Sequence, residues 1–370
     1  MHVVHVTSVH PWDDVRIFHR QCRSLAATGH RVSLVAARGP EPREATTHGV
    51  HVHLLRSPTG RWDRMVRLAP ALMRAARALE PDIIHFHDPE LLPFGARLPS
   101  GVRVVYDVHE DVAEDILDKP WLPAPLRRTA ARSYQLVERR CLRRIDGIVA
   151  ATPYIGGLYA GREVALAQNF PIRDDLACGG PPHAVRSPHV VYVGGLGAAR
   201  GTFEMLEGFR RVRSPGARLL VVGDFDDAGE RREIEAVAAG DPRIEFRGRM
   251  PRPEVRTLLP TCSVGVALYR ATGNYVRSQP NKLFEYMAAG VPAVATGFPL
   301  WREFVEGSGC GVCVDPTDAL AVAEAIDRLL ADVQMRDRMA AAGRQAVRER
   351  YCWEHEFEAV LGLYGRLLDA

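Results

Sequence analysis

The chain has 370 residues, of which 46% are hydrophobic and 25% are charged, and this length predicts two domains rather than one hydrophobic core. Its net charge is only +3, and no motif typical of DNA-binding or RNA-binding proteins is present. The first residues do not resemble a signal peptide, and no apolar run approaches the roughly 20 residues that span a bilayer. We therefore expect a globular, cytoplasmic protein.

Short runs rich in Val, Ile and Leu alternate with stretches of helical period, which favours βαβ units and parallel sheets. In residues 1–170 we expect strands at His2–Ser8, Arg31–Ala37, Val50–Arg56, Asp82–His87, Val102–Asp107, Gly147–Ala151 and Val164–Gln168. This alternation predicts a first Rossmann-like domain.

A segment rich in Pro, Gly and Asp follows, so we interpret residues 171–188 as a linker and residues 189–353 as a second domain. There we expect strands at His189–Val193, Ala217–Val222, Ile244–Arg247, Ser263–Leu268, Ala293–Thr296 and Gly311–Val314. The last helix carries an apolar stripe of Trp353, Phe357, Val360, Leu361, Tyr364 and Leu368. Such a stripe caps the second domain or crosses back onto the first.

The helix that Pro280 opens and Gly290 closes has the features of a phosphate site. Its first turn offers unpaired N–H groups and a positive dipole end, and it carries Lys282. One turn later, Glu285 can accept two hydrogen bonds from a ribose diol. On these grounds alone, a helix that merely packs in the core is an equal alternative.

The run Pro280-Asn-Lys-Leu-Phe-Glu-Tyr-Met-Ala-Ala-Gly-Val-Pro292 resembles the carboxy-terminal signature of retaining glycosyltransferases of family 4. Tyr106-Asp-Val-His-Glu-Asp111, Tyr192-Val-Gly-Gly-Leu-Gly-Ala-Ala-Arg-Gly201 and Val221-Val-Gly-Asp224 match other parts of the family in order and spacing. The resemblance implies the GT-B fold, in which two Rossmann-like domains with parallel sheets face a central cleft. It also implies that a helix at about 354–370 completes the first domain.

The family's donor-binding positions can be carried over to this sequence. Arg200 falls where a basic residue contacts the donor diphosphate, and Glu285 falls on the ribose position. His109 resembles the histidine that hydrogen-bonds the donor sugar. We expect His109, Arg200 and Lys282 to act in catalysis, and we expect the donor to be bound by Gly194, Gly195, Arg200, Gly223, Arg247, Gly248, Arg249, Met250, Asn281, Lys282, Leu283 and Glu285.

This sequence departs from the family pattern at two positions. Arg277 stands where a first glutamate is common, and Gly195 stands where an arginine on the diphosphate is common. We hypothesise that Lys282 replaces the missing charge. The first loop also lacks paired glycines, and His10, Asp13 and Arg16 are candidates for the acceptor side, with Asp13 as a helix cap and Arg16 in solvent as the alternative.

No side-chain nucleophile is evident, and a retaining transferase of this type needs none because the donor diphosphate can serve as base. We expect no metal and no cofactor: His85 and His87 share one face of a strand, but no third ligand is evident. Asp224-Phe-Asp226 could be the DxD of a metal-dependent GT-A enzyme, but it lies in the second Rossmann-like half. A dinucleotide-binding fingerprint fails because its third glycine would be Arg200.

The expected activity is transfer of a sugar from a nucleotide-sugar, UDP-linked by default and GDP-linked second, to a hydroxyl of a glycan, glycolipid or small-molecule acceptor. The alternatives are a sugar-nucleotide epimerase and a non-catalytic GT-B subunit. Residues 1–170 carry 23 Arg and Lys against 18 Asp and Glu, and the segment 61–77 interleaves arginines with apolar residues. Contact with an anionic membrane is the alternative there to an ordinary amphipathic helix.

Overall fold

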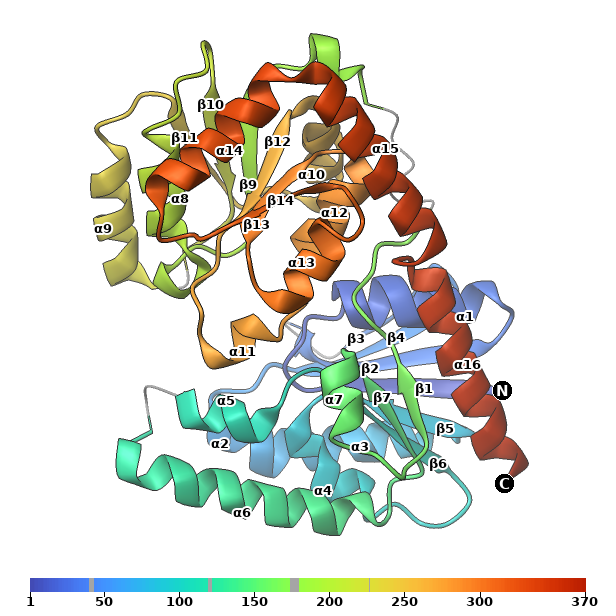
Figure 1. Cartoon of the computed structure of the whole chain (residues 1–370). Coiled ribbons are helices and arrows are strands. Elements are labelled where there is room, and N and C mark those ends of the chain that lie inside the picture. Colours follow the sequence, from blue (N-terminus) through green and yellow to red (C-terminus); the bar gives the residue numbers. More distant parts are fainter. Residues whose placement is uncertain (40–42, 119–121, 174–179, 226) are drawn as a thin grey trace. The chain divides into compact units, whose positions relative to one another are not determined.

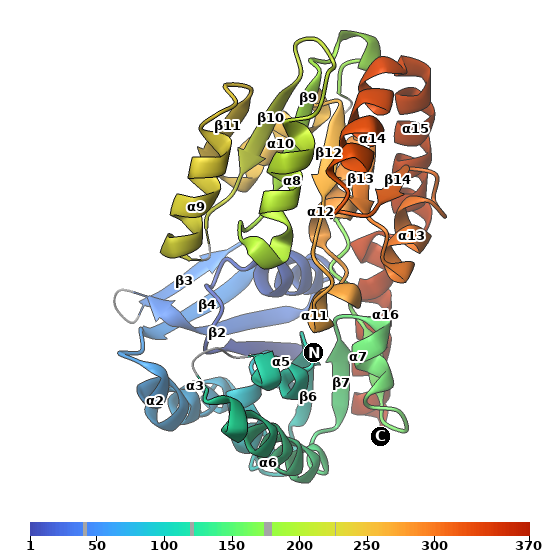
Figure 2. The same ribbon diagram turned by 60° about the vertical axis from the view of Figure 1, so that its left-hand side comes forward.

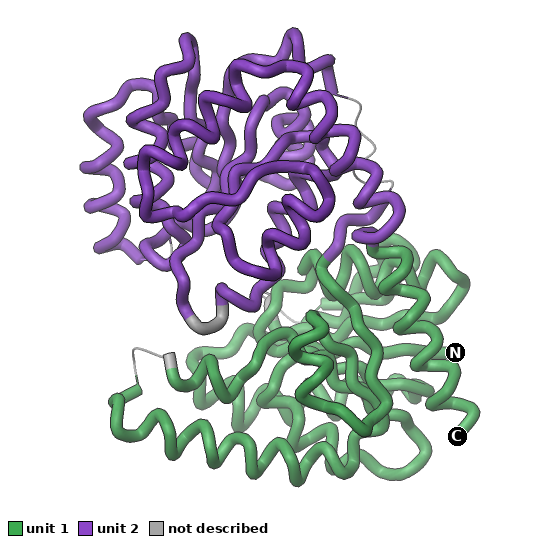
Figure 3. Tube along the Cα trace, in the orientation of Figure 1, with its two compact units in different colours: residues 1–169, 353–370 green, residues 170–352 purple. Residues whose placement is uncertain are grey.

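The computed structural model describes residues 1–39, 43–118, 122–173, 180–225 and 227–370. It divides into two compact units, one of residues 1–169 with 353–370 and the other of residues 170–352 (Figure 3). Most of the predicted linker's centre, residues 174–179, lies outside the described residues. In the described ranges, no helix is long and apolar enough to cross a bilayer.

The first unit is built on an eight-stranded sheet in its described part, ordered β3-β4-β2-β1-β5-β6-β7-β8 (Figure 1). Every strand predicted from the sequence is present here. The pairing is parallel except that β3 runs antiparallel to β4. The strands are β1 His2–Thr7, β2 Arg31–Gly39, β3 Arg43–Thr47, β4 Val50–Arg56, β5 Ile83–Phe86, β6 Arg103–Val108, β7 Gly147–Ala150 and β8 Val164–Leu166.

Helices cover both faces of this sheet (Figures 1 and 2). One face packs on the buried side chains of α3, α4 and the end of α6, including Leu72 and Leu92. The other face meets η1, α1 and α16. The helices are η1 Val15–Cys22, α1 Arg23–Ala27, α2 Arg61–Asp63, η2 Arg64–Leu68, α3 Ala69–Ala78, η3 Pro89–Leu91, α4 Leu92–Gly95, α5 Val112–Asp118, α6 Ala124–Leu142, α7 Pro153–Gly157 and α16 Trp353–Asp369.

The last helix, α16, is part of the first unit although it follows the second in sequence. Trp353 donates from Nε1 to Ser24 Oγ at 2.9 Å, and Glu356 accepts from the backbone N–H of Gln168 at 2.8 Å. The predicted stripe is wrong at two positions, because Leu361 is only partly buried and Leu368 is 41% exposed. Leu363 and Leu367 are buried in their place.

The second unit has a parallel sheet in the order β11-β10-β9-β12-β13-β14, again with every predicted strand present. Its strands are β9 His189–Val193, β10 Arg218–Val222, β11 Ile244–Gly248, β12 Val264–Ala267, β13 Ala293–Thr296 and β14 Gly311–Val314. Side chains of α8, α9 and α14 pack on one face, and those of α10, α12 and α13 pack on the other. The helices are η5 His183–Val185, η6 Ala198–Arg200, α8 Thr202–Phe209, α9 Ala228–Ala238, α10 Arg252–Leu258, η7 Leu259–Thr261, α11 Gly273–Val276, α12 Asn281–Ala289, α13 Pro299–Val305, α14 Ala319–Ala331 and α15 Val333–Glu349.

Each sheet reverses its strand order beside its first strand. In the first unit β1 lies between β2 and β5, and in the second β9 lies between β10 and β12. In open α/β sheets, ligands bind outside the carboxyl ends of the strands at such a switch point. Functional side chains are therefore expected at the carboxyl ends of β1, β5 and β6 in the first unit and of β9, β10 and β12 in the second.

Candidate functional site

A cavity of about 320 Å³ lies at the carboxyl ends of β9, β10 and β11 in the second unit. Five of the predicted donor-binding residues line it together, although they come from three separate parts of the sequence. They are Gly194, Gly195, Gly223, Arg249 and Met250. Val193, Val222, Asp224 and Val255 complete the lining.

Glycines allow the backbone segments around this cavity to approach closely. Gly223 has a φ of 153°, and a Cβ on it would lie 1.8 Å from the carbonyl oxygen of Gly194. The N–H of Gly194 donates to Val222 O at 2.9 Å, and the N–H of Gly223 donates to Gly248 O at 2.9 Å. A side chain at Gly223 would therefore separate the strand ends that form the cavity wall.

Lys282 lies in the first turn of α12 and is only 5% exposed. Its ammonium lies 3.4 Å from the ring centroid of Tyr192 and 5.1 Å from that of Tyr269. A Cβ on Gly194 would lie 3.0 Å from Nζ, so glycine at that position leaves room for the ammonium beside the strand end. Among the described residues, Nζ has no hydrogen-bond partner.

The electrostatic surroundings of Lys282 are dominated by burial. Burial lowers the pKa of Lys282 well below its ordinary value, and Arg200 lowers it further, whereas Glu285 acts in the opposite direction. The rings of Tyr192 and Tyr269 offer the ammonium their negative faces. A buried cation beside a second cation is an arrangement that an anionic ligand would stabilise.

Arg200 ends the short helix η6, just beyond the carboxyl end of β9. Its Nη1 donates to the hydroxyl of Tyr269 at 3.5 Å, so Tyr269 contacts both Arg200 and Lys282. Gly201 has a φ of 66°, and a Cβ on it would lie 1.3 Å from the carbonyl oxygen of Leu268. This close approach holds the turn that carries Arg200 against the end of β12.

The remaining predicted donor-binding residues differ in their surroundings. On α12, Asn281 is exposed, Leu283 is fully buried, and Glu285 is partly buried. Gly248 accepts the N–H of Gly223, but Arg247 is exposed and its Nε pairs with Glu245 at 2.9 Å. Arg247 therefore has a protein partner outside the residues that line the cavity.

Arg277, which stands at the position of the family's first glutamate, ends helix α11 and is exposed. The loop that follows it is fixed to the core, because Trp301 donates from Nε1 to Ser278 O at 2.8 Å. Of the Asp224-Phe-Asp226 motif, Asp224 lines the cavity and Asp226 lies outside the described residues.

In the first unit, His109 directly follows β6, and its side chain is 19% exposed. Its Nε2 lies 3.4 Å from Asp107 Oδ2 and 3.4 Å from His87 Nδ1. His10, at the carboxyl end of β1, has its ring centroid 5.1 Å from that of His109. The structure thus brings these two predicted residues together.

The other acceptor-side candidates, Asp13 and Arg16, lie in different environments. Asp13 is exposed, and the residue that caps the following helix is Asp14, which accepts the N–H groups of Arg16 and Ile17. Arg16 is 5% exposed, and its guanidinium forms two hydrogen bonds with Asp107 at 2.6 and 3.0 Å. The alternative of a solvated Arg16 is therefore wrong, because the buried carboxylate of Asp107 requires a partner.

Two groups of side chains in this unit have ligand atoms close enough for a metal ion, namely His5, His85 and His87, and His87, Asp107 and His109. His5 is the third histidine that the sequence did not reveal, and it pairs with His85 across β1 and β5. Asp107 Oδ2, however, already accepts from Arg16 Nε at 3.0 Å and Gln21 Nε2 at 2.7 Å. A guanidinium at this distance opposes a divalent cation, so the arrangement favours a hydrogen-bonded network.

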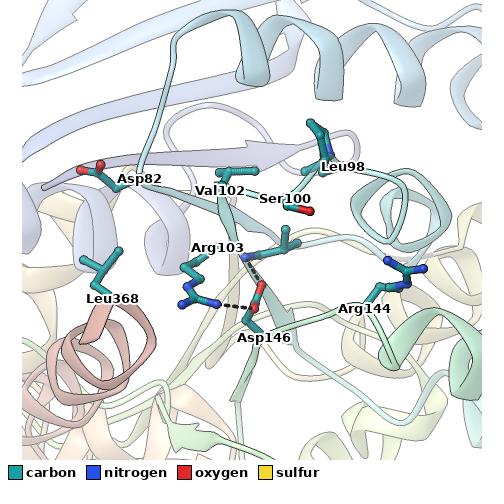
Figure 4. Close-up of a pocket in the computed structure, with 11 residues that line it drawn as sticks. Asp82, Leu98, Ser100, Val102, Arg103, Arg144, Asp146 and Leu368 are labelled. Atoms are coloured by element: carbon teal, nitrogen blue, oxygen red, sulfur yellow. Dashed lines mark hydrogen bonds and ion pairs between the residues drawn. The ribbon is translucent and has the colours of Figure 1, made fainter. Parts of the chain in front are cut away.

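A larger hollow of about 520 Å³ lies at the opposite edge of this sheet, by the amino ends of β5, β6 and β7 (Figure 4). Its acidic groups are already bonded within the protein. Asp146 pairs with Arg103 at 3.3 Å and accepts the N–H of Val104 at 2.8 Å, and Asp82 accepts the N–H of His2 at 2.6 Å. Its position at the amino ends of the strands also disfavours it as a catalytic site.

Comparison with known proteins agrees with this architecture. A family model described as "Glycosyl transferase 4-like domain" matches residues 15–169, and one described as "Glycosyl transferases group 1" matches residues 187–332. The chain is a family 4-like glycosyltransferase. The resemblance seen in the sequence and the predicted GT-B fold are thereby confirmed.

Individual relatives of this glycosyltransferase are distant but match over nearly the whole chain. A Mycobacterium tuberculosis glycogen synthase is 24% identical, with 94% of this chain and 90% of the relative covered. A GDP-mannose-dependent alpha-mannosyltransferase of Mycolicibacterium smegmatis is 26% identical, with 93% and 91% covered. The crystal structure of Anabaena HepE in complex with UDP has a TM-score of 0.76 at 14% identity and covers 99% of this chain and 100% of that one.

Three residues of these sites were missed in the sequence. Tyr192 and Tyr269 surround Lys282, and Asp107 joins Arg16, His87 and His109. Tyr192 lies in a strand and Tyr269 lies just after one, where an aromatic residue is ordinarily part of the core, so nothing in the pattern distinguished the two tyrosines. The signal for Asp107 was its place two residues before His109 at the end of a buried strand.

Proposed function

We propose that this glycosyltransferase binds a UDP-linked sugar and transfers the sugar to a hydroxyl group with retention of anomeric configuration. The observation that carries the proposal is the buried ammonium of Lys282, which has no hydrogen-bond partner in the described chain and lies beside Arg200. A diphosphate would supply the negative charge that this arrangement lacks. UDP in the HepE complex supports a uridine donor, and the M. smegmatis relative's name makes GDP-linked sugars the second choice.

The proposed reaction is stabilised mainly by fixed charges. As the diphosphate departs, negative charge builds on its oxygens, and Arg200, Lys282 and the amino end of α12 stabilise that charge. Glu285 binds the ribose hydroxyls, and Gly223 with Arg249 and Met250 accommodates the nucleoside. The acceptor hydroxyl attacks from the face that the diphosphate leaves and gives its proton to the leaving phosphate. The nucleotide-sugar is the substrate, and no metal or cofactor takes part.

His109 is proposed to hydrogen-bond the donor sugar, with His10 and Asp13 on the acceptor side. The acceptor is a glycan, a glycolipid or a small molecule. We place the protein in the cytoplasm, with peripheral contact to anionic lipid through the segment 61–77. Trp62 is 79% exposed there, and Leu68 and Leu72 are buried.

Binding of UDP to Lys282→Met tests the site, because methionine keeps the length of the side chain without its charge. We expect the Kd measured by calorimetry to rise at least about tenfold, which is the effect of one hydrogen bond to a charged group. Arg211→Met, at an exposed position just after α8, is the control and should bind UDP as the unaltered protein does. Equal affinity in Lys282→Met would contradict the assigned role.

The reaction itself is tested by incubating the protein with UDP-sugars and GDP-sugars. Slow hydrolysis without acceptor, and an α-linked product from an α-linked donor by NMR, are expected. Interconversion of donor epimers would instead identify an epimerase. Absence of hydrolysis and transfer with all donors would favour a non-catalytic subunit.

A further inference from the structure

The carboxylate of Asp107, in β6 of the first unit, is completely buried and is the point where several donors meet. Arg16 donates from Nη2 to Oδ1 at 2.6 Å and from Nε to Oδ2 at 3.0 Å, and Gln21 donates from Nε2 to Oδ2 at 2.7 Å. Burial alone would raise the pKa of Asp107, but Arg16, followed by His109 and His87, holds that pKa well below its ordinary value. Asp107 is therefore an anion inside the unit.

Three histidine nitrogens lie near this anion. His87 Nδ1 is 3.0 Å from Oδ2, His109 Nε2 is 3.4 Å away, and His85 Nε2 is 3.9 Å away. Burial lowers the pKa values of His85 and His87 well below the ordinary value, so both are neutral near pH 7. A neutral imidazole has one N–H and one lone pair, and a lone pair facing a carboxylate is repelled. We assign the N–H in each ring to the nitrogen nearest Asp107.

The outer contacts of these histidines agree with this assignment. With its proton on Nδ1, His87 has a lone pair on Nε2, and His5 Nδ1 lies 3.0 Å from that atom and can donate to it. With its proton on Nε2, His85 has a lone pair on Nδ1, and the Tyr364 hydroxyl lies 2.6 Å away and can donate to it. In each of these two outer contacts one atom donates and the other accepts. His87 Nδ1 and His109 Nε2 lie 3.4 Å apart, and with this assignment both direct their N–H to Asp107 rather than to each other.

We infer that Asp107 is a positioning residue that fixes His109 as the Nε2–H tautomer and so leaves Nδ1 as a hydrogen-bond acceptor. The inference rests on the proposed function, in which His109 meets the donor sugar. A sugar hydroxyl then donates a hydrogen bond to His109 Nδ1. A substrate group that can only accept hydrogen bonds forms none with this atom. Arg16 and Gln21 act through Asp107, because they hold the carboxylate in place.

The tautomer of His109 can be measured directly in the unaltered protein, so the test does not depend on whether a variant at Asp107 folds. Histidine side-chain ¹⁵N NMR spectra at pH 7.5 separate the two tautomers, and His109→Gln identifies the signal of His109 among those of 14 histidines. We expect His109 to carry its proton on Nε2. A proton on Nδ1, or an averaged signal from both tautomers, would overturn the inference whatever the catalytic activity.

The catalytic consequence is tested by a double-mutant cycle. Asp107→Asn should lower kcat at least about tenfold with a smaller effect on the KM for donor, as removing an orienting partner does elsewhere. In a His109→Ala background, Asp107→Asn should lower kcat less than about twofold, because the residue that Asp107 positions is absent. Equal losses in both backgrounds would show that Asp107 acts independently of His109.

Asp146→Asn is the matched control, since Asp146 also pairs with an arginine and a backbone N–H, but at the opposite edge of the sheet (Figure 4). It should leave kcat and the His109 tautomer unchanged. If no donor supports transfer or hydrolysis, the proposed function fails, while the NMR result still decides the tautomer.

Discussion

Lys282 shows how one side chain combines packing with binding. Its ammonium lies against two tyrosine rings and beside Gly194, in a position that no hydrophobic pattern would select for a lysine. The sequence indicated Lys282 through its place in the first turn of a well-defined helix. It could not indicate Tyr192 and Tyr269, because their proximity to Lys282 depends on β9, the end of β12 and α12 folding together.

The lowered pKa of Lys282 gives a prediction for donor binding. Between that lowered pKa and the ordinary value, the free protein holds fewer protons at Lys282 than a complex in which a diphosphate stabilises the ammonium. Binding of UDP should therefore take up a proton in this range, and affinity should fall as pH rises through it. Calorimetry at pH 8 in two buffers of different ionisation enthalpy measures the uptake, which Lys282→Met should lack. Identical binding heats in both buffers for the unaltered protein would refute the predicted proton uptake.

At the scale of elements, the segment from α2 to α3 has apolar side chains both on its buried face and on its exposed face. Leu68, Leu72 and Met73 pack on the sheet, while Trp62 and Val66 are 79% and 61% exposed one turn apart. Helix α6 packs on the same face of the sheet and carries exposed Leu136 together with Arg127, Arg128, Arg132, Arg139 and Arg140. Exposed apolar residues among arginines are typical of contact with an anionic interface.

Trp62→Ser with Val66→Ser tests the proposed membrane contact. We expect binding to vesicles with anionic lipid, measured by sedimentation, to fall at least about tenfold, because two apolar side chains no longer enter the interface. Leu320→Ser, 60% exposed on α14 of the second unit, should not change binding. No binding of the unaltered protein to these vesicles would dispose of the membrane contact.

The elements also show which sequence signals are sufficient to predict a strand. Strands such as β1 and β9 are rich in valine and largely buried, and they were predicted within a residue or two. The missed strand, β3, has the sequence Arg-Glu-Ala-Thr-Thr and is exposed along most of its length, so it has neither an apolar run nor a buried alternating face. It is a strand because it pairs with β4, and its own residues do not indicate that pairing.

At the scale of the whole molecule, the first unit depends on a segment that the chain supplies last. Between residues 169 and 353 the chain forms the second unit, and α16 then belongs to the first. The two errors in the predicted stripe of α16 are shifts of one or two positions around the helix. They arose because the pattern has more apolar residues than one face can bury, and only the shape of the sheet selects among them.

Removal of residues 353–370 should unfold the first unit and leave the second folded. The helix buries Trp353, Phe357, Val360, Leu363, Tyr364 and Leu367. At about 1.5–3 kcal/mol for each side chain, their combined burial is comparable to the roughly 5–15 kcal/mol that stabilises a whole domain. The second unit has its own sheet and buried clusters, so it keeps its contacts.

Limited proteolysis with mass spectrometry distinguishes the outcomes. The chain ending at Cys352 should lose residues 1–169 rapidly and yield a protected fragment of the second unit. A chain lacking only the last three residues, which are all exposed, should be as resistant as the full chain. A protected first unit in the shorter chain would mean that its sheet is stable with one face uncovered. In that case α16 would be needed for function rather than for folding. Whichever outcome is found, the second unit should bind UDP equally well in both shortened chains.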